Sequence, residues 1–516
     1  MDPTDPGEKE EDEEREATSR RSDGLAATVI RGSTLSGFGY ILAQALNLGV
    51  YVVLSRLLTP VEFGQYAAAA VLVGFGLLLT ESGMQSAIVH RDDRIEEAAN
   101  TALLALIVGG IASGIVAAAA APALGAIFDD AKVQDLALAS AGMILVGAMA
   151  IVPFALLQRR LAFLRIAIAE PVGVVVFGIV TIVLASDGFG PWALVIGQYA
   201  DLFASAAVSW LLVRWRPRPR LATYDMWRRL AAYGRPVLTS VMISRLATQG
   251  GDALVIGKGL GAGALGQFRY AFRVASLPHT VLLAGAGFVI FPVLARIADQ
   301  RERVSDAFLK AMRWLATLGL PAGMALIPLG PALIVLVFGE PWAPAGNAVA
   351  AMAAYVGGRA IVTAVIEMVK AVGNTPPLTR INLVIAVVTL GSMAALVPAG
   401  LTAAAAGISI GSIVGAAYAM WEARRAIGVP IRSMLDDIWP ALVASTVMAL
   451  AVLPLDRLVI EPATHGTAAG LALLVLEGIA CLGVYVGVMA ILAPNTLREI
   501  ASTIARRGRA DPAPAV

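Results

Sequence analysis

Long apolar runs occupy nearly all of this chain, and they indicate that it folds in a lipid bilayer. A run of about 18 or more apolar residues is typical of a transmembrane helix, because a hydrocarbon core about 30 Å thick requires that length. The sequence is 58% hydrophobic and 15% charged, whereas soluble domains average about 45–50% and about 25%. We therefore expect an all-α integral membrane protein, and composition excludes a soluble enzyme or a nucleic-acid-binding protein.

Turn-forming residues divide the apolar sequence into about fourteen predicted transmembrane helices. These helices are expected at 33–57, 66–90, 98–126, 134–157, 162–186, 190–213, 233–258, 267–296, 308–337, 342–371, 378–398, 400–422, 438–456 and 466–493. At the 398–422 boundary the sequence also allows one helix in place of two. That alternative gives thirteen helices and places the C-terminus outside.

The basic residues test this topology independently, because short cytoplasmic loops of membrane proteins are enriched in Lys and Arg. With the N-terminus inside, 31 of the 39 Lys and Arg residues fall in the expected inside segments. The six expected outside are Arg56, Lys132, Lys258, Arg269, Arg273 and Arg457. This distribution predicts an even number of helices and places both termini in the cytoplasm.

Polar segments at both ends and near the middle indicate how the chain is organised. The N-terminal segment is expected to be disordered, because acidic, turn-rich sequences bury little apolar surface. The arginines of the middle segment fit anionic headgroups at a membrane surface or, alternatively, a phosphate-binding substrate entrance. The expected parts are an acidic cytoplasmic tail at 1–30, six-helix lobes at 31–213 and 236–432, a basic cytoplasmic linker at 214–235, two further helices at 433–493 and a cytoplasmic tail at 494–516.

A short motif, Leu-x5-Gly-Gln-aromatic, occurs twice in the chain, 202 residues apart. One copy runs from Leu58 to Tyr66 and the other from Leu260 to Phe268. Both copies directly follow a predicted helix, and both are expected outside. The repetition indicates two similar halves, and transporters built from such repeats bind their substrate at the repeat interface.

Polar side chains form stripes along several predicted helices. They are spaced one helical turn apart and comprise Tyr40, Gln44, Asn47 and Tyr51; Glu81 and Gln85; Arg245, Thr248, Gln249 and Asp252; Arg269, Arg273, Ser276 and Thr280; and Tyr355, Arg359, Thr363, Glu367 and Lys370. Charged groups at membrane depth usually face a cavity or a partner. A water-filled cavity with several arginines suits an anionic ligand, because guanidinium groups bind phosphate oxygens in bidentate pairs. The alternative is internal ion pairs that hold the helices together, namely Arg245–Asp252 and Arg359–Glu367.

The sequence offers no ligand set for a metal or prosthetic group, and no cofactor is expected. Cys481 is the single cysteine, and His90, His279 and His465 are scattered. Glu170 and Asp201 are alternatives for a proton or sodium site, but they show no recognisable spacing. Coupling to a Na⁺ or H⁺ gradient is left open.

Three stretches resemble polysaccharide-transport flippases, the Wzx-like members of the multidrug/oligosaccharidyl-lipid/polysaccharide exporter superfamily. The stretches resemble that family's first outside loop, the end of its second helix and the exit of its seventh helix. They are Leu54-Ser55-Arg56-Leu57-Leu58-Thr59-Pro60-Val61-Glu62-Phe63-Gly64-Gln65-Tyr66, Thr80-Glu81-Ser82-Gly83-Met84-Gln85-Ser86-Ala87-Ile88-Val89, and the segment from Asp252 through Ile256-Gly257-Lys258-Gly259-Leu260-Gly261 to Gly266-Gln267-Phe268. The resemblance implies two pseudo-symmetric six-helix lobes around a V-shaped cavity, with two additional C-terminal helices.

The implied activity is movement of an undecaprenyl-diphosphate-linked oligosaccharide across the bacterial plasma membrane by alternating access. The implied partners are that lipid-linked oligosaccharide, membrane lipids, and a glycan polymerase or other assembly proteins. On this hypothesis, the expected ligands of the diphosphate or of anionic sugars are Arg245, Arg269 and Arg273. The expected sugar contacts are Gln44, Asn47, Gln85 and Gln249. The residues expected to gate the cavity or couple it to ions are Glu81, Asp252, Arg359 and Glu367.

Three other functions remain as alternatives. A drug or cation antiporter on the same fold would favour an acidic cavity, which the arginines oppose. A membrane glycan polymerase or ligase generally carries a large outside loop, and no expected outside loop exceeds roughly a dozen residues. The third is a transporter-like scaffold for a glycan-assembly complex. A flippase is the preferred interpretation, and no enzymatic activity is expected.

Overall fold

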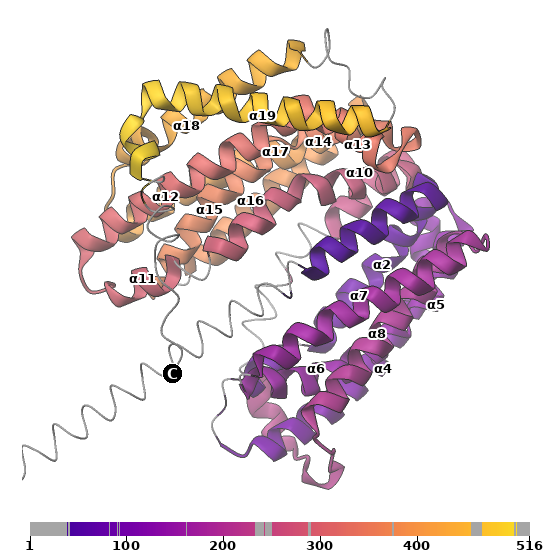
Figure 1. The fold of residues 1–516 in the computed structure, drawn as a ribbon. Helices are drawn as coiled ribbons and strands as arrows, with labels where there is room; N and C mark the ends of the chain where they lie inside the picture. Colours follow the sequence, from indigo (N-terminus) through magenta and orange to yellow (C-terminus); the bar gives the residue numbers. More distant parts are fainter. Residues whose placement is uncertain are drawn as a thin grey trace, which may run out of the picture. The chain divides into compact units, whose positions relative to one another are not determined.

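The computed structural model describes residues 39, 42–81, 83–89, 91, 93–160, 162–232, 242, 250–286, 290–373, 376–455, 467–499 and 502. Every regular element within these residues is a helix (Figure 1). The helices form two compact units. Unit 1 takes the described parts of Met1–Leu54, Leu72–Ala120 and Leu138–Thr239, and unit 2 takes those of Ser55–Val71, Ala121–Ala137 and Ser240–Val516.

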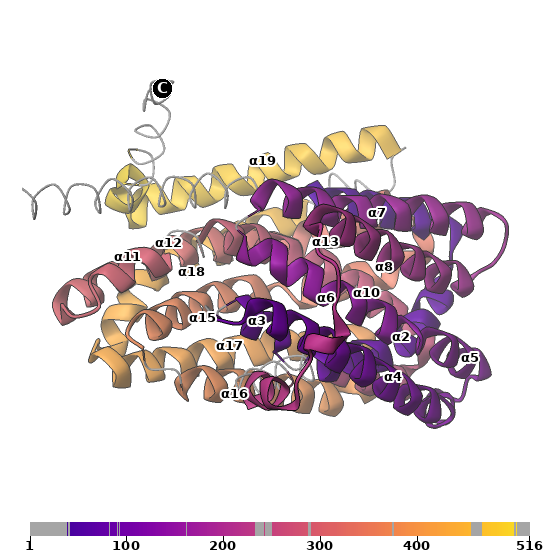
Figure 2. The same ribbon diagram turned by 90° about the horizontal axis from the view of Figure 1, so that it is seen from below.

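Unit 1 is a bundle of apolar helices packed around one core. Within it α7 and α8 pack side by side, and α6 packs against α8 (Figure 2). The core gathers buried side chains from α3, α4 and α6, among them Ile88, Leu106 and Val152. The helices of this unit are Leu42–Leu57, the second part of α2 (Pro60–Glu81), α3 (Met84–Val89), most of α4 (Ile95–Phe128), α6 (Met143–Arg159), α7 (Phe163–Ser186), α8 (Pro191–Val213), the 3₁₀ helix η1 (Pro219–Leu221) and a short helix at 224–232.

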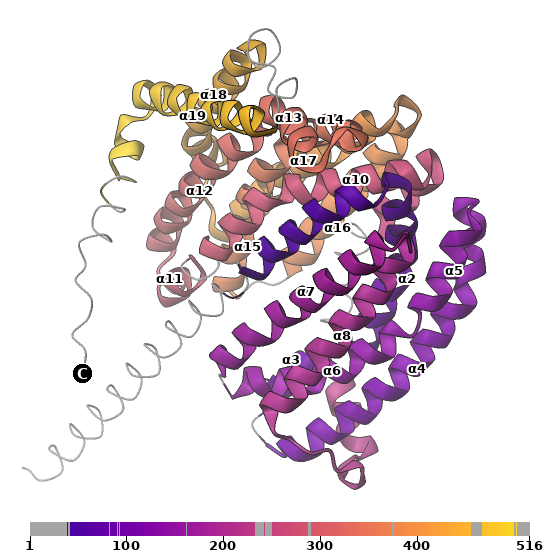
Figure 3. The ribbon, with the colours of Figure 1, turned by 45° about the vertical axis from the view of Figure 1, so that its right-hand side comes forward.

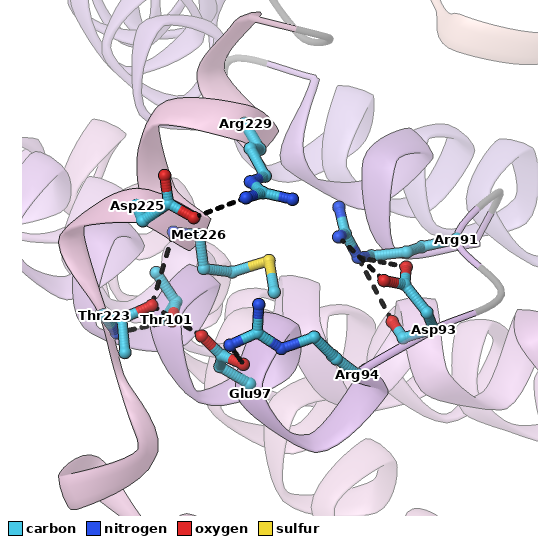
Figure 4. A network of polar contacts seen from close by, with 9 residues as sticks. All are labelled: Arg91, Asp93, Arg94, Glu97, Thr101, Thr223, Asp225, Met226 and Arg229. Atoms are coloured by element: carbon cyan, nitrogen blue, oxygen red, sulfur yellow. Dashed lines mark hydrogen bonds and ion pairs between the residues drawn. The ribbon is translucent and has the colours of Figure 1, made fainter.

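The basic segment after α8 is docked on unit 1 over its described part, 214–232. The Thr223 hydroxyl accepts a hydrogen bond from the Met226 N–H (3.3 Å) at the start of the short helix, which is the usual way to cap a helix N-terminus. The same hydroxyl donates to Glu97 (2.6 Å), at the start of α4 (Figure 4). Met226 and Leu230 are buried in the core of unit 1. This part of the expected linker therefore belongs to the folded unit.

Unit 2 is a larger bundle in which the two last helices pack along one side (Figure 3). α12 packs against α15 and α18, and α19 packs against α18 (Figure 3). The Tyr485 hydroxyl of α19 donates to the Thr317 carbonyl of α12 (2.7 Å). Unit 2 contains the first part of α2, the last turns of α4 and most of α5 (Ala131–Ser140). Its other helices are α10 (Gly251–Ala286), α11 (Ile290–Arg296), α12 (Arg301–Met324), α13 (Leu326–Phe338), η3 (Glu340–Trp342), α14 (Ala343–Ala351), α15 (Ala354–Ala371), α16 (Pro376–Leu396), η4 (Val397–Ala399), α17 (Leu401–Ile427), α18 (Ile431–Leu455) and α19 (Thr467–Leu492).

The prediction of an all-α, multi-pass membrane protein is confirmed. Within the described ranges, nine helices are long and apolar enough to cross a membrane, or up to eleven if each of two bent pairs is one span. At the 398–422 boundary the structure has two helices, α16 and α17, separated by η4 and by Gly400 with φ 96°. The count of fourteen stays a prediction, because the expected helix at 233–258 lies mostly outside the described residues.

Two expected single helices are bent by more than 40° at a break, which corrects the sequence-based boundaries. α12 and α13 are bent by 53°, within the expected helix 308–337. Pro321 and Pro328 flank this bend, and each proline removes a backbone donor and crowds the preceding turn. The expected helix 342–371 is likewise divided into α14 and α15, bent by 46°.

α2 begins where the sequence supplies a complete start signal. Thr59 precedes the helix, Pro60 is its first residue, and Glu62 is its third. The Thr59 N–H donates to Glu62 Oε2 (2.8 Å), and the Glu62 N–H donates to Thr59 Oγ1 (3.3 Å). This reciprocal capping box satisfies two donors that a helix start leaves open, and proline at the first position lacks such a donor. The first copy of the repeated motif is therefore the N-terminal turns of α2.

Candidate functional site

α10 carries most of the predicted ionic residues of unit 2, in two arms that meet at Gly261. Gly261 has φ 85° and ψ 172°, a backbone conformation open essentially to glycine alone. The loop expected at 259–266, between the predicted seventh and eighth helices, is replaced by this single-residue break. Asp252 lies on the first arm, and Arg269 and Arg273 lie on the second.

Asp252 and Arg269 form an ion pair that joins the two arms. Arg269 Nη2 lies 3.1 Å from Asp252 Oδ1, and the Ala253 N–H donates to the same oxygen (2.7 Å). Asp252 is only 3% exposed. An ionised carboxylate at that depth is costly unless a cation and hydrogen bonds compensate it. The pair therefore neutralises Asp252 and fastens the first arm to the second.

A small cavity opens beside this ion pair, within unit 2. Its volume is about 60 Å³, which is room for several water molecules. Its lining comes from α10, α15, α16 and α17 and comprises Asp252, Phe272, Tyr355, Arg359, Ile385, Thr389, Met393, Ile408 and Ser412. The cavity can hold water or a small ion.

Arg359 gives this cavity an excess of positive charge. Its Nε is buried and has no hydrogen-bond partner among the residues that the structure describes. The neighbouring Tyr355 packs edge-on against Phe272 (ring centroids 5.4 Å apart) and against His279 (5.8 Å). Because Asp252 is already paired, the Arg359 charge favours an anion or oriented water over a second cation.

Glu367 forms a different ion pair from the one considered in the sequence. Its Oε1 lies 2.9 Å from Lys370 Nζ, one turn further along α15. The alternative partner, Arg359, lies eight residues away, which is about 12 Å along a helix axis. The predicted alternative of an Arg359–Glu367 ion pair is therefore wrong. The Arg245–Asp252 pair cannot be compared, because Arg245 lies outside the described residues, as does Gln249.

The predicted polar residues of the first half belong to unit 1. Gln85 of α3 donates from Nε2 to Gln158 Oε1 of α6 (3.0 Å). Gln44 and Asn47 are half-buried on the helix Leu42–Leu57, and Glu81 ends α2. The structure thus brings Asp252, Arg269 and Arg359 together, and it places Gln44, Asn47 and Gln85 on two helices of the other unit.

Two hydroxyl groups of the cavity had no signal in the sequence. Thr389 and Ser412 line it from α16 and α17, and such residues are common in transmembrane helices, where they hydrogen-bond to neighbouring backbone. Asp201, considered as an ion site, accepts hydrogen bonds from Gln198 (2.8 Å) and Ser205 (3.1 Å) of its own helix. Within the described ranges, no group of three or more His, Cys, Asp or Glu residues is arranged to hold a metal ion.

Comparison with known proteins places this fold among polysaccharide transporters. The profile of the family described as "Polysaccharide biosynthesis protein" matches residues 53–347. The succinoglycan biosynthesis transport protein ExoT of Rhizobium meliloti (strain 1021) is 27% identical over 434 residues, covering 83% of this chain and 86% of that protein. The lipopolysaccharide biosynthesis protein WzxC of Escherichia coli (strain K12) is 26% identical over 331 residues, or 62% of this chain and 65% of that protein.

A solved structure shows the same fold. The lipid II flippase MurJ, in an inward closed conformation, aligns with a TM-score of 0.70 over 90% of this chain and 100% of that chain, at 15% identity. The resemblance inferred from the motifs agrees with these findings. Because the family profile covers more than half of its residues, the chain belongs to the polysaccharide biosynthesis protein family of multi-pass membrane proteins.

Proposed function

We propose that the protein is a flippase that moves an undecaprenyl-diphosphate-linked oligosaccharide from the inner to the outer leaflet of a bacterial plasma membrane. The observation that carries this proposal is the family match over residues 53–347. The relatives ExoT and WzxC are named for the transport or synthesis of polysaccharides. Such polymers are assembled from units too polar to cross a bilayer unaided. The proposed activity contains no catalytic step.

Arginines of α10 are the proposed ligands of the diphosphate. Arg269 and Arg273 are one turn apart on the second arm of α10, and Arg245 lies outside the described residues. Guanidinium groups bind phosphate oxygens in bidentate pairs, which makes them suited to this headgroup. Since Arg269 is paired with Asp252, binding would exchange that carboxylate for a phosphate oxygen.

Other predicted residues complete the proposal. The amide side chains of Gln44, Asn47, Gln85 and Gln249 would contact sugar hydroxyls, since each offers both donors and an acceptor. Glu81, Asp252, Arg359 and Glu367 would control opening or couple it to a Na⁺ or H⁺ gradient. Both termini would be cytoplasmic, and a glycan polymerase would take the product outside. The proposed parts are the lobes 31–213 and 236–432, the linker 214–235 and the helices in 433–493.

Transport of a labelled lipid tests the proposal directly. Purified protein is reconstituted in proteoliposomes with a fluorescent polyprenyl-diphosphate oligosaccharide, and movement between leaflets is followed with and without Na⁺ and H⁺ gradients. We expect Arg245→Ala to reduce the rate at least tenfold with normal membrane insertion, because one ligand of the diphosphate is lost. Arg220→Ala, at an exposed position, is the matched control and should keep the rate.

Two outcomes would contradict the proposal. One is a wild-type protein that transports an organic cation but leaves the labelled lipid in place, as a drug antiporter would. The other is an Arg245→Ala variant that moves the labelled lipid at the wild-type rate. In that case Arg245 is no ligand of the headgroup.

A further inference from the structure

The two copies of the repeated motif lie against each other in unit 2. A Cβ atom at Gly64 would overlap the carbonyl oxygen of Ala262 and lie 3.0 Å from the Gly266 nitrogen. A Cβ atom at Gly266 would overlap the carbonyl oxygen of Pro60 and lie 3.0 Å from the Gly64 nitrogen. The contact is reciprocal, because each glycine lies against the backbone of the other copy. Such an approach is open only to glycine.

Two neighbours extend this contact. A Cβ atom at Gly263 would lie 3.2 Å from Val61 Cγ2. Pro60, Val61 and Gly64 of α2, together with Ala262, Gly263 and Gly266 of α10, are here named the glycine clasp. None of these six residues carries a charge, so parting the clasp exposes backbone and aliphatic groups and breaks no buried ion pair within it.

The glutamine of each motif holds its own copy in shape. Gln65 donates from Nε2 to Asp130 Oδ2 (2.7 Å), in the turn before α5. Gln267 donates to the Pro341 carbonyl (2.7 Å) and accepts from the Ala345 N–H (3.1 Å). Each copy is thus anchored to its own half of the sequence. The glycines, by contrast, make contact between the halves.

Aromatic and hydrogen-bonding contacts lie around the clasp. The Phe63 ring packs edge-on against Tyr270 (4.9 Å between centroids) and Trp342 (5.5 Å). The Trp342 Nε1–H donates to the Ser55 carbonyl (3.0 Å), and Arg56 donates to the Leu336 carbonyl (3.1 Å). Water can replace each of these hydrogen bonds when the surfaces separate.

The glycines are required by their neighbours and not by their own backbone. Gly64 and Gly266 both lie within helices, and neither has a positive φ. Alanine favours a helix over glycine by about 1 kcal/mol. A glycine kept at such a position therefore lowers the stability of its own helix and permits the close contact.

We propose that the glycine clasp is the outer closure of the transport cycle, shut in the state seen here and parted before the cargo is released outside. The inference rests on the proposed function, and it adds the residues that seal the outer end. The assignment follows from three features: the reciprocal glycine contact, the separate anchoring of each copy, and the expected outside position of both motifs. A seal of this kind must be tight when closed and free of strong bonds when it opens.

Alanine substitutions test the need for close contact. Gly64→Ala and Gly266→Ala are expected to fold and insert, because alanine suits a helix. Their transport rate should fall at least tenfold, since the added methyl group overlaps backbone that cannot rotate away. Gly74→Ala, on the same helix with nothing within 4 Å of the added atom, is the matched control and should keep the rate. Wild-type transport by both clasp variants would overturn the proposal.

A reversible cross-link tests whether the clasp must part. Val61→Cys and Gly263→Cys are combined with Cys481→Ala, which removes the one native cysteine. Oxidation should join the two positions, since a Cβ atom at 263 would lie 3.2 Å from Val61 Cγ2, close to where a cysteine sulfur at 61 can lie. Transport should stop on oxidation and return on reduction, and the single Val61→Cys variant should respond to neither. Transport at the same rate in the oxidised and reduced states would show that the clasp stays in contact throughout transport, and it would overturn the proposal.

A third measurement separates this inference from the proposed cargo. Spin labels at Leu57 and Lys258, both exposed, report the separation of the two copies without any transport assay. Two distance populations are expected in reconstituted protein, and one fixed distance under all ion and lipid conditions overturns the closure. If two distance populations appear but the protein moves no lipid-diphosphate oligosaccharide, the proposed closure is supported and the proposed cargo is wrong.

Discussion

Asp252 illustrates, at the scale of single residues, how this chain holds charge at membrane depth. Its carboxylate is compensated by Arg269 at 3.1 Å, from the opposite arm of α10. Removing one partner leaves the other without compensation, whereas removing both leaves a neutral contact. A single change should therefore cost more stability than the double change.

Arg269→Gln is expected to lower the free energy of unfolding. The loss should be below the roughly 3–5 kcal/mol typical of a fully buried pair, because the Arg269 side chain is 25% exposed. The double variant Asp252→Asn/Arg269→Gln should recover most of the loss. Thermal unfolding in detergent, followed by tryptophan fluorescence, gives the coupling energy from the four proteins. Strictly additive effects would show that the two side chains do not interact.

The sequence predicts the members of this site better than their pairing. Helical periodicity selects Asp252, Arg269 and Arg359, because polar residues one turn apart share a face. It does not predict the Asp252–Arg269 pair, since these residues are 17 positions apart and meet only because the helix breaks at Gly261. Thr389 and Ser412 give no signal at all. Contacts between helices depend on packing that a one-dimensional pattern does not contain.

At the scale of elements, breaks and bends within helices are what the sequence predicts least well. Long apolar runs give the helices but not all of their ends. α19 agrees with the expected 466–493, whereas α17 ends at Ile427 and not at 422, and α18 begins at Ile431 and not at 438. Bends are less predictable, because proline alone is an ambiguous signal. Pro122, Pro153 and Pro171 lie inside α4, α6 and α7 without ending them. Transmembrane helices tolerate proline because neighbouring helices, side chains and water can satisfy the freed carbonyls.

Gly261→Ala is expected to lower the free energy of unfolding by about 1–3 kcal/mol. A Cβ atom there meets nothing within 4 Å, so the cost comes from the backbone conformation alone. Gly391→Ala, in α16 and equally uncrowded, should be neutral or stabilising by about 1 kcal/mol at most. Thermal unfolding of both variants in the same detergent makes the comparison. Equal stabilities would mean that the break at Gly261 can relax.

Topology is the property of the whole molecule that the sequence predicts most directly. Basic residues alternate between sides because translocation of short loops disfavours Lys and Arg. This principle predicts where each loop lies, even though the described residues alone do not fix the number of helices. Short loops also explain why the chain has no separate soluble domain among its expected parts.

Cysteine labelling in intact cells checks this topology. In a Cys481→Ala background, Lys132→Cys should react with a membrane-impermeant maleimide, because it is exposed and expected outside. Arg220→Cys, also exposed, should react only after the membrane is permeabilised. The reverse pattern would invert the orientation. Labelling of both positions from outside would require an even number of spans between them.

The break at Gly261 has an evolutionary consequence. Many binding proteins change specificity by lengthening surface loops on a constant scaffold. Here one glycine joins the two arms of α10, and an inserted residue would displace an arm, the Asp252–Arg269 pair and the second motif together. Divergence toward other glycans should therefore proceed by exchanging side chains along helix faces. Homologous sequences should keep a constant length from 252 to 269 while their polar side chains vary.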